Sequence, residues 1–136
     1  MKRHFLFVLA VLLLSIAPVY SQTTTLDAKT KAQVLRDIRY MIYDEIHILA
    51  HRYLNTDQAG AANSMKIGQQ KIDELQSHIK SLCGGNDAPN SFYKEAVGKA
   101  RDMGKKQIGI YFTTPDQQAE VEKVYQKYGQ MGVAGQ

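Results

Sequence analysis

The chain has 136 residues, a formal net charge of +4, a single cysteine and no tryptophan. Its length allows one domain with a modest core but not two domains that each bury their own. The low charge and the lack of a basic, aromatic-rich face argue against nucleic acid as a partner.

Residues 1–21 have the pattern of a secretory signal peptide. Lys2 and Arg3 precede a run over residues 5–17 that is apolar except for Ser15. A helix of about 13 such residues spans roughly 20 Å, too short for a hydrocarbon core of about 30 Å. The side chains before Gln22 predict cleavage between Ser21 and Gln22. We therefore expect a mature domain of residues 22–136 that is secreted or periplasmic, with a charge of about +2 and no transmembrane span.

The first helix is expected over residues 26–54, where apolar residues recur every three or four positions. Asn55, Thr56 and Asp57 provide turn and cap side chains, so the helix should end near Leu54. Its apolar stripe comprises Leu35, Ile38, Ile42, Ile46, Leu49 and Tyr53.

A second helix is predicted over residues 57–83. Gly68 on its apolar seam should let a neighbouring helix approach closely. Gly84 and Gly85 can adopt the left-handed conformation that ends a helix. The seam consists of Met65, Gly68, Ile72, Leu75, Ile79 and Leu82.

Two further helices are expected over residues 90–106 and 115–128. Between them, residues 107–113 alternate apolar and polar side chains, which favours an extended connector. Thr114, Pro115 and Gln117 have the residue types of a capping box with proline at the first helical position. Four amphipathic helices with short connections predict an all-α fold, a small up-and-down antiparallel bundle.

Asp44, His47 and His51 are candidate metal ligands on the first helix. Their spacing of three and four residues brings all three side chains to one helix face, where they could hold a transition metal such as zinc. That face lies nearly opposite the apolar stripe, however, and an ordinary solvated surface is the alternative. A second pair, Glu74 and His78, should lie roughly 16 Å from His47 in an antiparallel hairpin, so one shared site is not expected.

Tyr40 and Tyr43 are candidate contacts to a ligand or a protein partner, because tyrosine combines apolar area with a polar tip and both lie off the main stripe. The alternative is that they border the core. Cys83 has no second cysteine with which to form an internal disulfide. It is either a buried apolar residue or the site of an intermolecular disulfide in a homodimer.

Motifs for nucleophilic catalysis, phosphate binding or a zinc protease are absent from the sequence, so we expect no enzyme. The leading hypothesis is a non-catalytic helical binding protein for an apolar small ligand or a protein partner, with no cofactor. The alternatives are a metal-binding protein built on His47 and His51, and an extracellular protein that self-assembles or binds other proteins.

Overall fold

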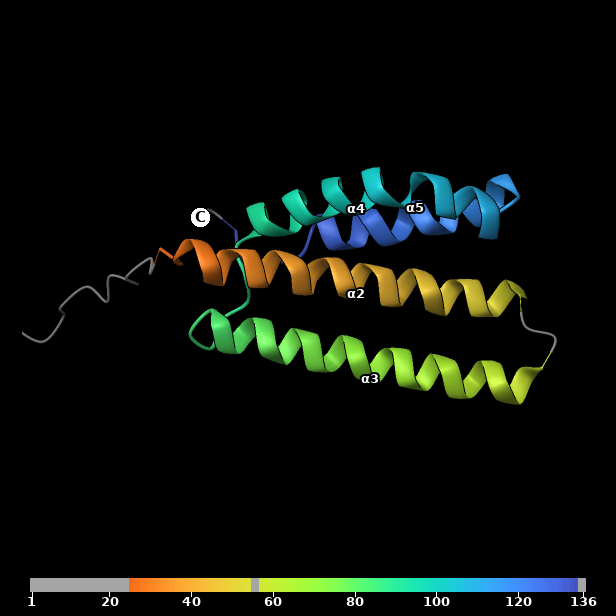
Figure 1. Cartoon of the computed structure of the whole chain (residues 1–136), viewed down its shortest axis with the longest axis horizontal. Coiled ribbons are helices and arrows are strands. Elements are labelled where there is room, and N and C mark those ends of the chain that lie inside the picture. Colours follow the sequence, from red (N-terminus) through yellow and green to blue (C-terminus); the bar gives the residue numbers. More distant parts are fainter. Residues whose placement is uncertain (1–24, 55–56, 135–136) are drawn as a thin grey trace, which may run out of the picture.

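A computed structural model describes residues 25–54 and 57–134, and over these ranges the secondary structure is four helices without a strand. Successive helices run in opposite directions, as Figure 1 shows, so the predicted up-and-down helical bundle is confirmed. The proposed signal peptide lies outside the described residues. The helices are α2 (Ala28–Leu54), α3 (Gln58–Leu82), α4 (Asn90–Tyr111) and α5 (Pro115–Gly129).

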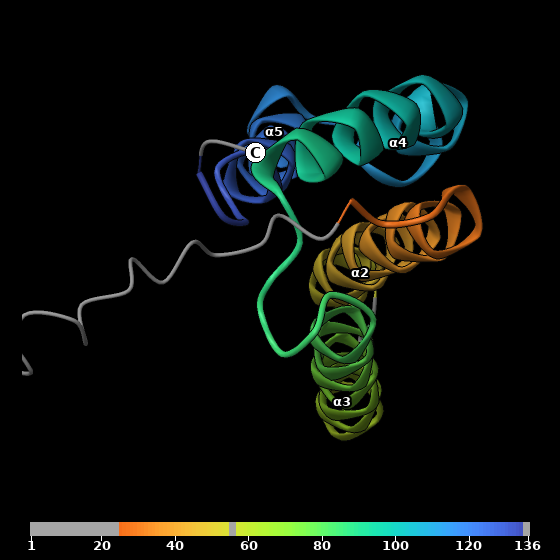
Figure 2. The same cartoon turned by 90° about the vertical axis from the view of Figure 1, so that its left-hand side faces the viewer.

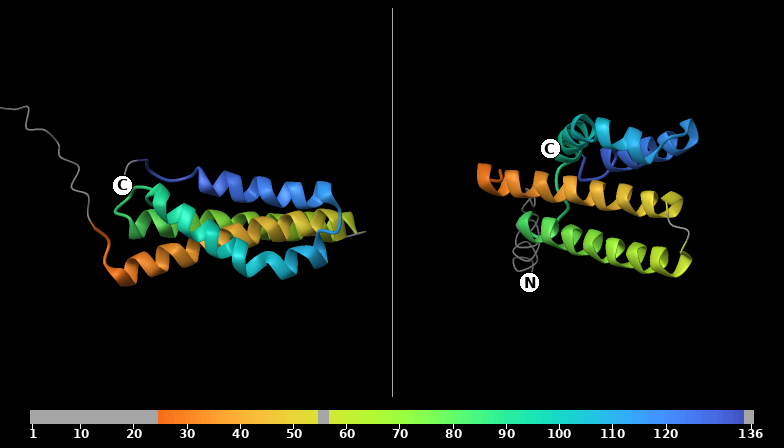
Figure 3. Two further views of the ribbon diagram at one scale, coloured as in Figure 1. Left: turned by 90° about the horizontal axis from the view of Figure 1, so that it is seen from above. Right: turned by 45° about the vertical axis from the view of Figure 1, so that its right-hand side comes forward.

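Helix α2 is the central element of the fold, because it contacts each of the other three described helices. Helices α4 and α5 pack against each other on one side of α2, and α3 lies on the opposite side (Figures 2 and 3). Among the described helices, α3 packs against α2 alone. The bundle is therefore layered rather than closed around one axis.

The core lies mainly where α2 meets α4 and α5. Large side chains with almost no exposed surface come from all three helices and from the residue that follows α4. Burial of such side chains is the main favourable term in folding. They include Val34, Ile38, Met41, Ile42, Tyr93, Phe112, Val121 and Tyr128.

The helix starts agree with the expected caps. The side chain of Asp57 accepts hydrogen bonds from the backbone N–H groups of Ala59 and Gly60 at the start of α3. At the start of α5, Thr114 and Gln117 form a reciprocal capping box. Both caps satisfy N–H groups that have no partner inside the helix.

The expected extended connector over residues 107–113 is wrong, because α4 continues to Tyr111. The backbone N–H of Phe112 still donates to the carbonyl oxygen of Ile108. Ile108 and Phe112, four residues apart, turn toward the core, whereas Ile110 is 70% exposed. The alternating apolar residues therefore belong to the end of a helix, where Ile110 faces outward and the other two face the core.

Two glycines mark places where chain segments approach closely. A Cβ atom at Gly68 would lie 2.8 Å from Cγ1 of Ile48, which confirms the close approach of α3 to α2 expected there. Gly132 has a φ of +93°, and a Cβ at this position would lie 2.6 Å from the carbonyl oxygen of Ala88. Two backbone hydrogen bonds join Val133 to Ala88 and Asn90 beside it, so the chain after α5 is tied to the start of α4.

None of the helices in the described part of the chain combines the length and the apolar character needed to cross a membrane.

Candidate functional site

A partly open cavity of about 180 Å³ lies between α2, α4 and α5, and we call it the inner cavity. Its position follows from the extra turn of α4, which carries Ile108 and Tyr111 alongside the second half of α2. Its surface is mainly apolar, as is usual for small-molecule sites. The lining residues are Tyr43, Ile46, His47, Ala50, Gly104, Gln107, Ile108, Tyr111, Phe112 and Tyr125.

Tyr125 on the wall of this cavity differs from the other two deeply buried tyrosines. The hydroxyl of Tyr93 donates to Oδ1 of Asp87 at 2.6 Å, and that of Tyr128 donates to the carbonyl oxygen of Met41 at 3.4 Å. Tyr125 is only 3% exposed, and its hydroxyl has no hydrogen-bond partner among the described residues. A buried hydroxyl left in this state costs about 1–3 kcal/mol.

The Tyr125 hydroxyl lies close to the backbone of α4, because a Cβ at Gly104 would be 3.1 Å from it. Burial raises the pKa of Tyr125, and the Arg101 guanidinium, 4.8 Å from the ring centroid, partly opposes this shift. The phenol is therefore neutral at ordinary pH and keeps a proton to donate. The absence of a side chain at Gly104 leaves room for this hydroxyl beside α4.

An open groove of about 510 Å³ runs between α2 and α3, and we call it the α2–α3 groove. Charged side chains of both signs line it, together with two tyrosines. The groove exists because α3 packs against α2 alone. Its lining residues are Arg36, Asp37, Tyr40, Tyr43, Asp44, Lys71, Glu74, Leu75 and His78.

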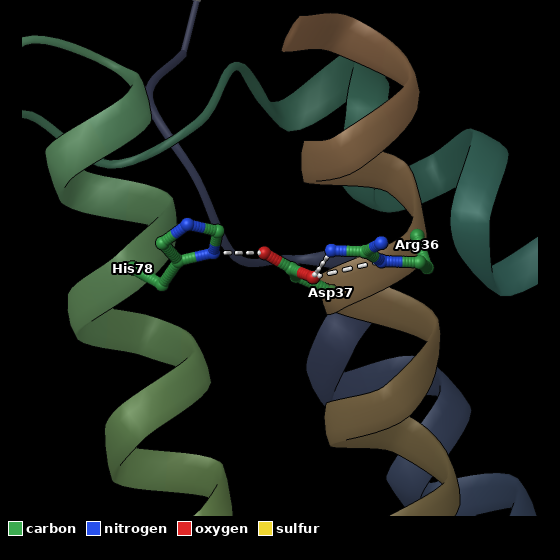
Figure 4. Close-up of polar contacts among 3 residues, drawn as sticks. All are labelled: Arg36, Asp37 and His78. Carbon is green, nitrogen blue, oxygen red and sulfur yellow. Dashed lines mark hydrogen bonds and ion pairs between the residues drawn. The ribbon is translucent and has the colours of Figure 1, made fainter.

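Asp37 is the buried charged residue of this groove, with 2% of its surface exposed. Figure 4 shows it between two partners. Its Oδ2 lies 2.6 Å from Nδ1 of His78, and its Oδ1 accepts from Nε and Nη2 of Arg36 at 3.3 and 3.2 Å. Both carboxylate oxygens are thus occupied, which offsets the cost of burying the carboxylate.

The sequence reasoning missed Asp37, although a signal was present. Asp37 lies three residues after Val34 and four before Met41, so it shares the helical spacing of residues that turn inward. An acid in such a position requires a partner. In the structure this partner is His78 on α3, whereas the sequence spacing pairs His78 with Glu74.

Tyr40 and Tyr43, the predicted contact residues, both line the α2–α3 groove. Tyr40 is half exposed, and Tyr43 also lines the inner cavity. The Tyr43 hydroxyl lies 3.6 Å from Sδ of Met103, which is exposed. Whether either tyrosine contacts a ligand or a partner stays a prediction. Tyr43 is the residue that the two hollows share.

The three candidate metal ligands do not line one common hollow. Nε2 of His47 and Nε2 of His51 lie 3.0 Å apart, and His47 lines the inner cavity. Asp44 lines the α2–α3 groove, where burial raises its pKa and Lys71 and His47 partly oppose the shift. In the described ranges, histidine, cysteine, aspartate and glutamate side chains form no group of three that could hold a metal.

Cys83 is the C-cap residue of α3 and is partly buried against the core. Burial raises the pKa of its thiol, and the Asp87 carboxylate raises it further. Both effects disfavour the reactive thiolate. The intermolecular disulfide remains a prediction.

Comparison with family models, curated proteins and solved structures gave no match for this chain.

Proposed function

We propose that the protein is an exported, non-catalytic binding protein that holds a small single-ring ligand in the inner cavity. The ligand is mainly apolar and carries one hydrogen-bonding group, for which phenol is the simplest probe. The observation that carries the proposal is the Tyr125 hydroxyl, which is buried at the cavity wall without a partner among the described residues.

The size and lining of the inner cavity support a ring of this kind. An apolar protein cavity of about 150 Å³ is large enough to bind benzene, and the inner cavity measures about 180 Å³. Ile46, Ala50 and Ile108 offer apolar contacts. A ligand hydroxyl that bonds to Tyr125 would also remove the cost of leaving that group unpaired.

The α2–α3 groove is the weaker candidate for such a ligand. It is more open and more polar than the inner cavity, and the oxygens of its buried carboxylate already have partners in Arg36 and His78. An apolar ring would gain less there by leaving water.

Titration calorimetry with phenol and benzene tests the proposal. Ala50→Leu adds bulk to the cavity wall and should abolish binding of both probes. Ala62→Leu makes the same change at an exposed position on α3 and should leave binding intact. Absence of saturable phenol binding to the native chain, or equal binding by the Ala50→Leu variant, would rule out the inner cavity as the site.

Export is tested separately from binding. The chain, expressed in a bacterial host with its own leader, should be recovered from the periplasm with Gln22 as its first residue. An N-terminal sequence that still contains residues 1–21 would show that the leader is not cleaved.

A further inference from the structure

His47 and His51 lie one turn apart on α2 and turn their rings toward each other. Their Nε2 atoms are 3.0 Å apart, their ring centroids 4.6 Å apart, and the ring planes are inclined by 85°. Both residues lie inside a regular helix, well before its last residue, Leu54. The backbone therefore holds the two side chains one helical turn apart before anything binds.

This separation is close to the one that a metal ion requires. A tetrahedral zinc ion with Zn–N bonds of about 2.0–2.1 Å holds two ligand nitrogens about 3.3–3.4 Å apart. The two Nε2 atoms would have to separate by only a few tenths of an ångström, which side-chain rotation on a helix can supply. In the absence of an ion, the same two atoms are at hydrogen-bond distance.

We propose that His47 and His51 chelate one divalent transition-metal ion, such as zinc, through their two Nε2 atoms. Imidazole nitrogen is a ligand that suits zinc, copper and nickel, whereas magnesium and calcium prefer oxygen. Water completes the coordination, since the described residues offer no third protein ligand of a usual type beside the pair. The ion is accordingly exchangeable.

This site goes beyond the proposed ligand cavity, although the two are neighbours. His47 lines the inner cavity as well as facing His51. The metal site does not depend on the Tyr125 hydroxyl. Failure of phenol binding would therefore not count against zinc binding, and failure of zinc binding would not count against phenol binding.

The test is a zinc titration of the exported chain, purified without a histidine tag. Calorimetry should show saturable binding of one zinc ion. His47→Ala and His51→Ala should each weaken binding by about tenfold or more, since loss of a supporting residue outside the ligand set already costs 10–100-fold. His78→Ala is the matched control and should leave zinc affinity unchanged, because Nδ1 of His78 is engaged by Asp37 in the α2–α3 groove, which neither His47 nor His51 lines.

A second measurement needs no variant. In an ¹⁵N-labelled chain, zinc should shift the Nε2 resonances of His47 and His51 and leave the ring nitrogens of His78 in place. The proposal is overturned if zinc does not bind saturably, if His78→Ala weakens binding as much as the other two variants, or if the His78 nitrogens are the ones that shift.

Discussion

The two sides of α2 are built differently. On one side, α4 and α5 cover it with large apolar side chains and leave the small inner cavity. On the other side, α3 lies alone and contributes only Ala61, Ile72 and Ile79 to the buried residues. The buried charge of the core region, Asp37, is also on this side, where His78 of α3 engages it.

This difference indicates what each side can do. Under the proposed function, the tightly packed side, where the Tyr125 hydroxyl has no partner among the described residues, is preorganised for a ligand that supplies that partner. The α3 side is held by few buried contacts and one polar pair, so its local opening should cost less free energy than global unfolding.

Phe112→Ala should be the most damaging change. Phe112 is 1% exposed and lies where α4 turns into α5, with its ring 6.1 Å from that of Tyr53 in an edge-on arrangement. Truncation of a buried phenylalanine costs about 3–5 kcal/mol. Urea unfolding should show a loss of this size, and a loss below about 1 kcal/mol would mean that the core does not depend on this side chain.

His78→Ala should loosen α3 and leave the other side of α2 nearly unchanged. Loss of a hydrogen bond to a charged group costs about 1.5–3 kcal/mol, and the half-exposed position of His78 places the cost at the low end. Hydrogen exchange should accelerate in α3 more than in α4 and α5. Equal acceleration in all three helices would contradict the contrast between the two sides.

Replacement of the whole pair is the control for that experiment. The double variant Asp37→Leu, His78→Leu removes the buried carboxylate together with its partner. It should recover part of the stability lost in His78→Ala, because no charge is left buried with one partner missing. Urea midpoints of the two variants measure the difference.

Gly68→Ala and Gly98→Ala form a matched pair of changes inside helices. At Gly68 the new methyl would meet Ile48, whereas at Gly98 it would meet nothing within 4 Å. We expect Gly68→Ala to cost about 1 kcal/mol through overpacking. Gly98→Ala should gain up to about 1 kcal/mol from helix propensity. Thermal unfolding of both variants should therefore shift in opposite directions.

Tyr125→Phe should have the smallest effect on the free protein. It removes a hydroxyl that has no partner among the described residues, so stability should stay level or rise by up to about 1 kcal/mol. Tyr93→Phe breaks the bond to Asp87 and should lower stability by a similar amount. A clear loss of stability in Tyr125→Phe would show that its hydroxyl is already satisfied.

Much of the fold could be predicted because it depends on local patterns. The ends of α3 follow from Asp57, Gly84 and Gly85, and the start of α5 follows from Thr114 and Gln117. Such signals act within a few residues of the position that they mark. They indicate where helices begin and end but not which helices touch.

The site was harder to predict because it depends on contacts between distant segments. Asp37 and His78 are 41 residues apart, and nothing local to either residue names the other. The inner cavity depends on the last turn of α4. The sequence does not reveal that this turn is helical, because Ile108, Ile110 and Phe112 alternate with other residues as in a strand. The sequence does not distinguish Tyr125 from Tyr93 and Tyr128, and only the three-dimensional structure shows that its hydroxyl, unlike theirs, has no partner among the described residues.

A phenol titration followed by ¹H–¹⁵N NMR of the native chain would show whether a ligand occupies the inner cavity. Binding in the inner cavity predicts progressive shifts at Ala50, Gly104 and Ile108, with Ile72 and Ile79 on α3 unaffected. Shifts confined to α3 and the α2–α3 groove, or no shifts at saturating phenol, would contradict it.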